Sequence, residues 1–134
     1  VFLKVLGIDT NDRTALYYYV QIALRSNQIA EAKKIIEQVD KNTAIYEFIS
    51  GLVKEHEAGH EQALKHFRAA WAKDAFDLYA EKLYGLYTAQ KDKTAIKNLV
   101  TEWAGRLPNS GQAILLSAML KQEEGLNDDA IKLY

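Results

Sequence analysis

Apolar residues along this chain recur every three or four positions, the spacing that places them on one face of an α-helix. Ile29, Ala32, Ile35 and Val39 form a clear run of this kind. Alternation of the strand type does not extend beyond a few residues, and no Asn-Gly or Asp-Gly pair is present to start a β-hairpin. The pattern therefore predicts an all-α protein.

Interruptions of the apolar pattern divide the chain into a series of short predicted helices. Their expected ranges are 1–7, 12–25, 28–39, 43–57, 60–73, 76–90, 92–106, 110–124 and 127–134. Proline occurs once, at Pro108, and no low-complexity linker or change of composition separates the helices. We therefore expect one domain over residues 1–134. Because Val1 begins inside an amphipathic pattern, we expect the chain to be part of a longer array.

A repeat underlies these helices. The segments NQIAEAKKII, GHEQALKHF, KDKTAIKNL and LNDDAIKLY each contain an alanine that opens the apolar stripe of a helix. We call these the anchor alanines: Ala32, Ala63, Ala95 and Ala130. Four residues after them lie Ile36, Phe67, Leu99 and Tyr134, a series that Phe2 extends backwards. Twelve residues before them lie Val20, Gly51, Leu83 and Ala118.

The repeat spans two helices, and its physics favours stacking. Two short antiparallel helices cannot cover their own apolar faces, whereas a stack of such pairs buries a continuous core. Small residues at the anchor alanines and at Gly51 allow neighbouring helices to approach closely. The expected architecture is an α-solenoid of antiparallel helix pairs. Its units are approximately 1–9 (partial), 12–41, 43–74, 76–108 and 110–134 (partial).

This pattern resembles the tetratricopeptide repeat (TPR) family, whose unit is about 34 residues long. The small residues Gly51 and Ala118, the anchor alanines and the large apolar residue one turn later match the family's motif. The chain departs from it at Glu47, where the family prefers a large apolar residue, and at Lys54 and Lys121, where it prefers an aromatic one. The resemblance implies a right-handed superhelix whose first helices line a concave surface, and it implies binding of proteins.

By this resemblance, a set of residues in the first helices points to the concave face and contacts a partner. The set is Tyr17, Gln21, Phe48, Leu52, Tyr84, Tyr87, Leu115 and Met119, with Tyr84 and Phe48 as the strongest candidates. Aromatic residues and Met are enriched in the cores of protein interfaces, and a large exposed apolar surface usually marks a contact site. The same side chains can instead pack against the adjacent repeat, and the pattern does not separate the two roles.

A narrower likeness concerns location. The segments LYGLYTAQKDKTAIKNLVTEWAGRLPN and EEGLNDDAIKLY resemble the large TPR lipoproteins of bacterial exopolysaccharide and exosortase systems. This likeness implies a bacterial protein in the periplasm or at the periplasmic face of the outer membrane. It also suggests an alternative function, that of a self-associating structural spacer in an exopolysaccharide or secretion assembly.

The segment HEAGHEQALKH presents an H-E-x-x-H pattern at His56, Glu57 and His60. A zinc metallohydrolase with this motif needs both histidines on one unbroken helix, so that their imidazoles converge on the metal. The repeat instead places Ala58 and Gly59 in the turn between two antiparallel helices. We therefore disfavour the metal site and expect solvated histidines. The acidic pairs Glu123–Glu124 and Asp128–Asp129 are likewise expected to be solvated, the latter at a helix N-terminus.

Composition narrows the function further. Of the 134 residues 49% are hydrophobic and 26% charged, the formal net charge is −1, and there is no cysteine. This near-neutral balance disfavours nucleic acid as a partner, and no apolar run is long enough for a membrane span. Trp71 and Trp103 each follow an anchor alanine by eight residues and are expected in the core. We predict a non-catalytic scaffold without a cofactor, which binds a partner's helix or extended peptide.

Overall fold

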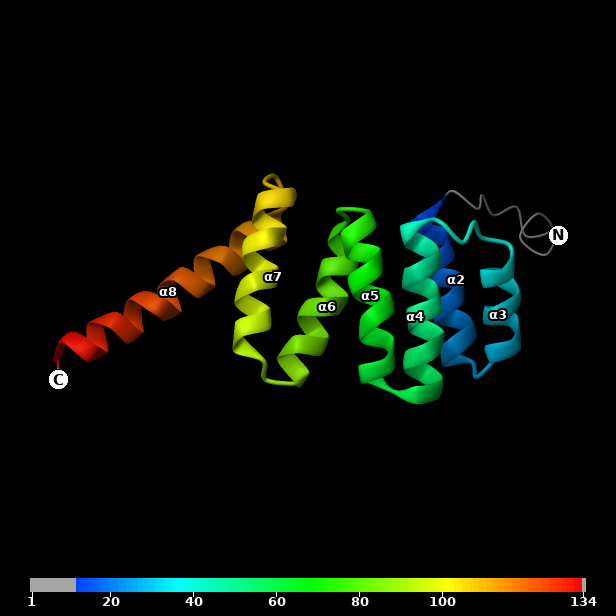
Figure 1. Ribbon diagram of the computed structural model, residues 1–134, viewed down its shortest axis with the longest axis horizontal. Coiled ribbons are helices and arrows are strands. Elements are labelled where there is room, and N and C mark those ends of the chain that lie inside the picture. Colours follow the sequence, from blue (N-terminus) through cyan, green and yellow to red (C-terminus); the bar gives the residue numbers. More distant parts are fainter. Residues whose placement is uncertain (1–11, 134) are drawn as a thin grey trace. The chain divides into compact units, whose positions relative to one another are not determined.

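The structure of the protein is a computed structural model that describes the backbone of residues 12–133 and the side chains of residues 12–125. All regular secondary structure in this range is α-helical, which confirms the predicted all-α class (Figure 1). The helices are α2 (Arg13–Arg25), α3 (Ile29–Glu37), α4 (Ala44–Ala58), α5 (His60–Lys73), α6 (Asp77–Ala89), α7 (Lys93–Arg106) and α8 (Gly111–Leu133).

The six predicted helices between residues 12 and 106 are all present, with ends within two residues of expectation. Local capping explains several of these ends. The side chains of Asp12, Thr43 and Asp92 each accept a hydrogen bond from the backbone N–H three residues later, at the start of α2, α4 and α7. Such caps satisfy backbone donors that have no partner within the helix. The predicted helix 1–7 lies outside the described residues.

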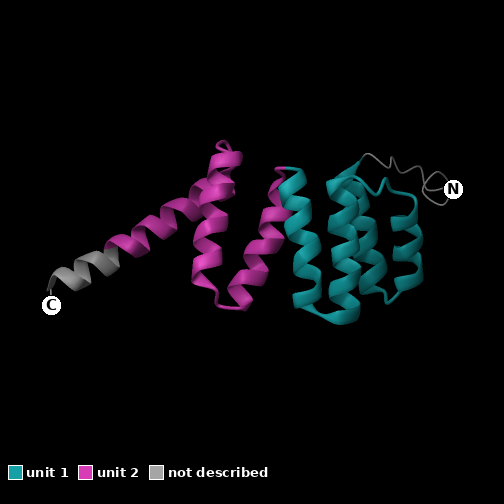
Figure 2. Ribbon diagram, in the orientation of Figure 1, with its two compact units in different colours: residues 1–74 teal, residues 75–134 magenta. Residues whose placement is uncertain are grey.

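Two compact units divide the chain, Val1–Asp74 and Ala75–Tyr134 (Figure 2). The boundary falls where the second predicted repeat ends. In the first unit α2 packs on α3 and α4, and α4 packs on α5 along its length. In the second unit α7 packs on both α6 and α8.

The core of the first unit follows the predicted repeat. The anchor alanines Ala32 and Ala63 are fully buried, as is Phe67 one turn after the second of them. The ring of Phe67 lies 5.4 Å from that of Phe48 between ring centres. Gly51 faces the same ring so closely that a Cβ atom there would lie 2.7 Å from Phe67 Cε1. The small residue late in α4 is therefore required by the approach of α5.

One polar residue ties the second unit together. Asp77 Oδ1, at the start of α6, accepts a hydrogen bond of 2.7 Å from Trp103 Nε1 in α7. It accepts another of 2.7 Å from Ser110 Oγ, immediately before α8. Trp103 itself is only 1% exposed, so its indole N–H depends on this acceptor. The same carboxylate thereby fixes α7 and the start of α8 relative to α6.

The predicted turn between helices 110–124 and 127–134 is wrong, because α8 continues through Gly125 to Leu133. A glycine inside a helix costs only about 1 kcal/mol relative to alanine, which alone does not end a helix. A turn at this point would need packing of a second helix to stabilise it, as α5 stabilises the turn after α4. Asp128 and Asp129 consequently lie within α8 and not at a helix N-terminus.

Candidate protein-binding surface

The histidine motif is divided by a turn, as predicted. His56 lies near the end of α4 and His60 opens α5, with Gly59 between the two helices at φ 94° and ψ 179°. His60 Nδ1 lies 2.9 Å from Glu55 Oε2, so this ring meets a carboxylate and not a second histidine. Among the side chains that the structure describes, no three His, Asp or Glu residues are placed to hold a metal ion together.

Replacing Gly59 with alanine is expected to lower the free energy of unfolding by about 1–2 kcal/mol, because its φ lies in a region that only glycine adopts without strain. Chemical denaturation followed by circular dichroism measures the change. Gly105→Ala is the matched control, since Gly105 is helical and a Cβ there meets nothing within 4 Å. That control should be neutral or slightly stabilising. An equal loss in both variants would contradict the role of the Gly59 turn.

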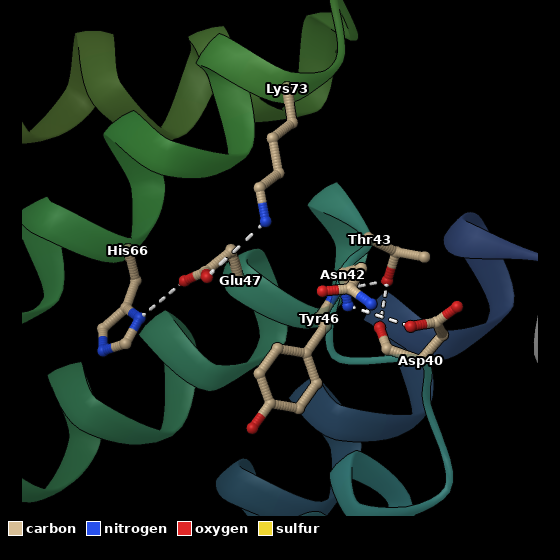
Figure 3. Close-up of polar contacts among 7 residues, drawn as sticks. All are labelled: Asp40, Asn42, Thr43, Tyr46, Glu47, His66 and Lys73. Atoms are coloured by element: carbon tan, nitrogen blue, oxygen red, sulfur yellow. Dashed lines mark hydrogen bonds and ion pairs between the residues drawn. The ribbon is translucent and has the colours of Figure 1, made fainter.

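Glu47 explains one departure from the TPR motif. Its Oε2 lies 3.0 Å from His66 Nδ1, and its Oε1 lies 3.9 Å from Lys73 Nζ, both on α5 (Figure 3). A carboxylate thus takes the place of an apolar contact between α4 and α5. His66 therefore contacts Glu47 within this helix pair.

The nearby start of α4 is held by Thr43, whose Oγ1 donates to the Asp40 carbonyl and accepts from the Tyr46 N–H.

Three of the eight predicted contact residues are buried within their own unit. Phe48 is 0% exposed, Leu52 2% and Tyr87 6%. The ring of Phe48 contacts two others, because its centre lies 5.7 Å from that of Tyr17 and 5.4 Å from that of Phe67. These three side chains cannot reach a partner unless the helices move. They take the packing role that the sequence pattern left open.

The other five predicted residues reach the surface to different degrees. Tyr17 and Gln21 are half-buried on α2, where Gln21 Nε2 donates to Tyr17 Oη at 2.9 Å. Tyr84 is half-buried on α6. Leu115 and Met119, on α8, are exposed by 61% and 53%. Tyr17 and Gln21 belong to the first unit, whereas Tyr84, Leu115 and Met119 belong to the second.

Tyr84 borders a cleft in the second unit. The cleft has a volume of about 370 Å³ and lies among α6, α7 and α8; its lining residues are Tyr84, Thr88, Lys93, Ile96, Lys97, Leu120, Glu123 and Glu124. Lys97 Nζ pairs with Glu124 Oε1 at 2.8 Å across it. The hydrogen bond and the charge of Glu124 raise the pKa of Lys97 above its ordinary 10.5. The contribution of Lys97 to stability through this pair is therefore present at neutral pH and is lost as the pH rises through its raised pKa.

Among the described side chains of the second unit, the large apolar residues that are exposed lie on one face of α8. This face is formed by Ile114, Leu115, Ala118 and Met119, and we call it the α8 face. Ile114, Leu115 and Met119 are each more than half exposed, and Ala118 is exposed between them. Residues at these spacings share one side of a helix. The sequence pattern predicted Leu115 and Met119 at a surface but not Ile114, which lies one position before the predicted series.

The α8 face corresponds residue by residue to the part of α4 that α5 covers. Ser110 caps α8 as Thr43 caps α4, and both lie at the same distance before their anchor alanines. Leu115 therefore corresponds to Phe48, Ala118 to Gly51 and Met119 to Leu52. The α4 residues are buried. The positions that are buried on α4 are therefore exposed on α8.

The same comparison holds for α6, which α7 covers. Counted from the anchor alanine Ala95, the corresponding residues of α6 are Tyr79, Ala80, Leu83 and Tyr84. The first three of them are at most 1% exposed, and Tyr84 is half-buried. No helix among residues 12–125 occupies the corresponding place on α8.

A second group of exposed apolar side chains lies on α2. Tyr18, Tyr19 and Ile22 are exposed by 58%, 38% and 61%. They follow one side of the helix, whereas Tyr17 turns toward Phe48. The sequence predicted only that the three consecutive tyrosines could not share one environment. The large apolar residues found exposed in the described range therefore belong to α2 and α8.

Comparisons with known proteins give no family for this chain. No family model matches it, and neither a curated protein nor a solved structure matches it. None of the helices in residues 12–133 combines the length and apolar character needed to cross a bilayer.

Proposed function

We propose that this protein is a non-catalytic scaffold of the helical-repeat type that binds a segment of another protein on the α8 face. The observation that carries the proposal is the exposure of Ile114, Leu115 and Met119, whereas the residues at the same positions of α4 and α6 are buried or half-buried. Exposed apolar surface of this continuity is typical of an interaction site. The TPR-like repeat supports the same class of function by resemblance.

The chemistry of the face favours a protein segment over a small polar ligand. Ile114, Leu115 and Met119 lie within one turn of Ala118, and the exposed charged residues Lys121 and Glu123 follow on the next turn of α8. An apolar centre with a polar rim is the usual arrangement of protein interfaces. The cleft beside Tyr84, which has four charged residues and an internal ion pair, is less suited to this role.

A photoreactive phenylalanine analogue at Met119 is expected to cross-link a specific protein in an extract of the native host, because the side chain is exposed within the apolar face. The matched control carries the analogue at Asn98, which is exposed on α7 outside the face. Gel electrophoresis and mass spectrometry identify the products. Leu115→Gln should reduce the yield at Met119 by several-fold, since it introduces a polar amide into the contact.

The outcomes of this experiment separate the candidate functions. A host protein captured from Met119 but not from Asn98 supports the scaffold. Cross-linking to a second copy of the chain instead supports the structural spacer, which the exposed Tyr18 and Ile22 on α2 also favour. Identical products from Met119 and Asn98 would contradict binding on the α8 face. So would the absence of any product when the analogue is placed in turn at Ile114, Leu115 and Met119.

A further inference from the structure

We infer that the partner segment is an amphipathic helix that lies antiparallel on the α8 face, as α5 lies on α4, and that carries leucine-like residues where α5 has His66 and Phe67. This inference rests on the proposed function and names the class of partner. The α4–α5 pair is the complete form of an interface of which α8 presents only one half.

The α4–α5 pair defines what such a helix needs. α5 buries Ala63, Phe67, Ala70 and Trp71, which recur at one-turn and two-turn spacings along one face. Its other side, which includes Glu61, Lys65 and Arg68, is exposed. The single connecting residue, Gly59, makes the two helices antiparallel. A partner for α8 therefore requires a small residue followed one turn later by a large apolar one, on a helix that is polar elsewhere.

Ile114 changes the requirement at one position. The corresponding residue in α4 is Glu47, which accepts from His66. Ile114 has no acceptor, so an imidazole at the His66 position of a bound helix would be desolvated without a hydrogen bond. An unsatisfied buried polar group is strongly unfavourable. The α8 face consequently favours an aliphatic residue there.

Ala118 changes the requirement at the next position. In α4 the corresponding residue is Gly51, and a Cβ atom there would lie 2.7 Å from Phe67 Cε1 and 2.9 Å from His66 Cβ. Ala118 carries that Cβ atom, so a phenylalanine ring in the same place would overlap it. The second unit shows the alternative, because Leu99 of α7 takes the position of Phe67 in a pair whose first helix carries Leu83 and not glycine. A leucine is therefore the better complement to Ala118.

Two synthetic peptides test the inference against the whole chain. Both copy residues 59–74; the matched peptide also carries His66→Leu and Phe67→Leu, and the reference peptide is unchanged. A hydrocarbon staple replaces the exposed Glu61 and Lys65 in both, since an isolated helix of this length is only marginally formed. Fluorescence anisotropy of the labelled peptides measures binding. We expect the matched peptide to bind about tenfold more tightly than the reference, as expected for relief of one unpaired polar group.

The same measurement on the variant Leu115→Gln, Met119→Gln should remove this preference. Leu115 and Met119 are both exposed, so circular dichroism of the double variant should show an unchanged helix content. Equal affinity of the two peptides, absence of binding by both, or binding that the variant does not weaken would overturn the inference. So would a dimer in sedimentation that the variant dissociates, because the occupant would then be a second copy. If the peptides bound equally, did not bind, or bound the variant as well, a host protein cross-linked from Met119 would still support the proposed function.

Discussion

Replacing Trp103 with alanine is expected to lower the free energy of unfolding by about 3–5 kcal/mol. The side chain is 1% exposed in the core of the second unit, and its removal leaves a cavity that the surrounding helices fill only in part. The variant also loses the hydrogen bond from Trp103 Nε1 to Asp77 Oδ1. Urea denaturation followed by helical circular dichroism measures the loss.

Trp103→Phe separates the two contributions. Phenylalanine keeps most of the buried aromatic surface but cannot donate to Asp77, which retains its bond from Ser110. We expect this variant to lose about 1–2 kcal/mol, the usual range for a single buried hydrogen bond together with a small packing defect. A loss below about 1 kcal/mol for Trp103→Ala would mean that the α6–α7 core is not packed as described.

Several features that the predicted repeat register implies could be read from helical spacing alone. Trp71 and Trp103 were expected in the core from their distance to an anchor alanine, and both are at most 4% exposed. The turn at Gly59 followed from the same register, and it correctly separated His56 from His60. Periodicity identifies which residues face a neighbouring helix, and these predictions required nothing more.

Periodicity did not show which apolar positions remain exposed on the first helix of each predicted pair. Phe48 and Leu52 were predicted at a surface, whereas other helices of the first unit cover both of them. Leu115 and Met119 occupy the same register and are exposed, because no described helix covers this face of α8. Equal positions in the repeat thus differ in exposure according to their neighbours. The sequence of one helix holds no signal for that difference.

The role of Glu47 was hidden for a related reason. It appeared only as a departure from the family's motif, but its carboxylate pairs with His66 and Lys73 on the next helix. The partners lie 19 and 26 residues away in sequence, and helical spacing gives no reason to join them. They became evident only when α5 was placed on α4. The preference of the α8 face for a different helix follows from this same pair, because Ile114 replaces Glu47.

Gly51→Val is expected to destabilise the first unit by about 3 kcal/mol, at the upper end of the usual cost of overpacking a core. Even a Cβ atom at Gly51 would lie 2.7 Å from Phe67 Cε1, and valine adds two further methyl groups. The ring cannot yield easily, because Phe67 is fully buried and also contacts Phe48. The higher helix propensity of valine than of glycine offsets only a few tenths of a kcal/mol. Urea denaturation measures the change.

Gly85→Val is the matched control, since Gly85 also lies inside a first helix, α6, but a Cβ atom there meets nothing within 4 Å. Its stability should change by less than about 0.5 kcal/mol, as for other exposed helix positions. If Gly51→Val behaved like Gly85→Val, α5 would not approach α4 as closely as described. The correspondence of Gly51 with Ala118, and with it the preference of the α8 face for leucine over phenylalanine, would then lose its physical basis.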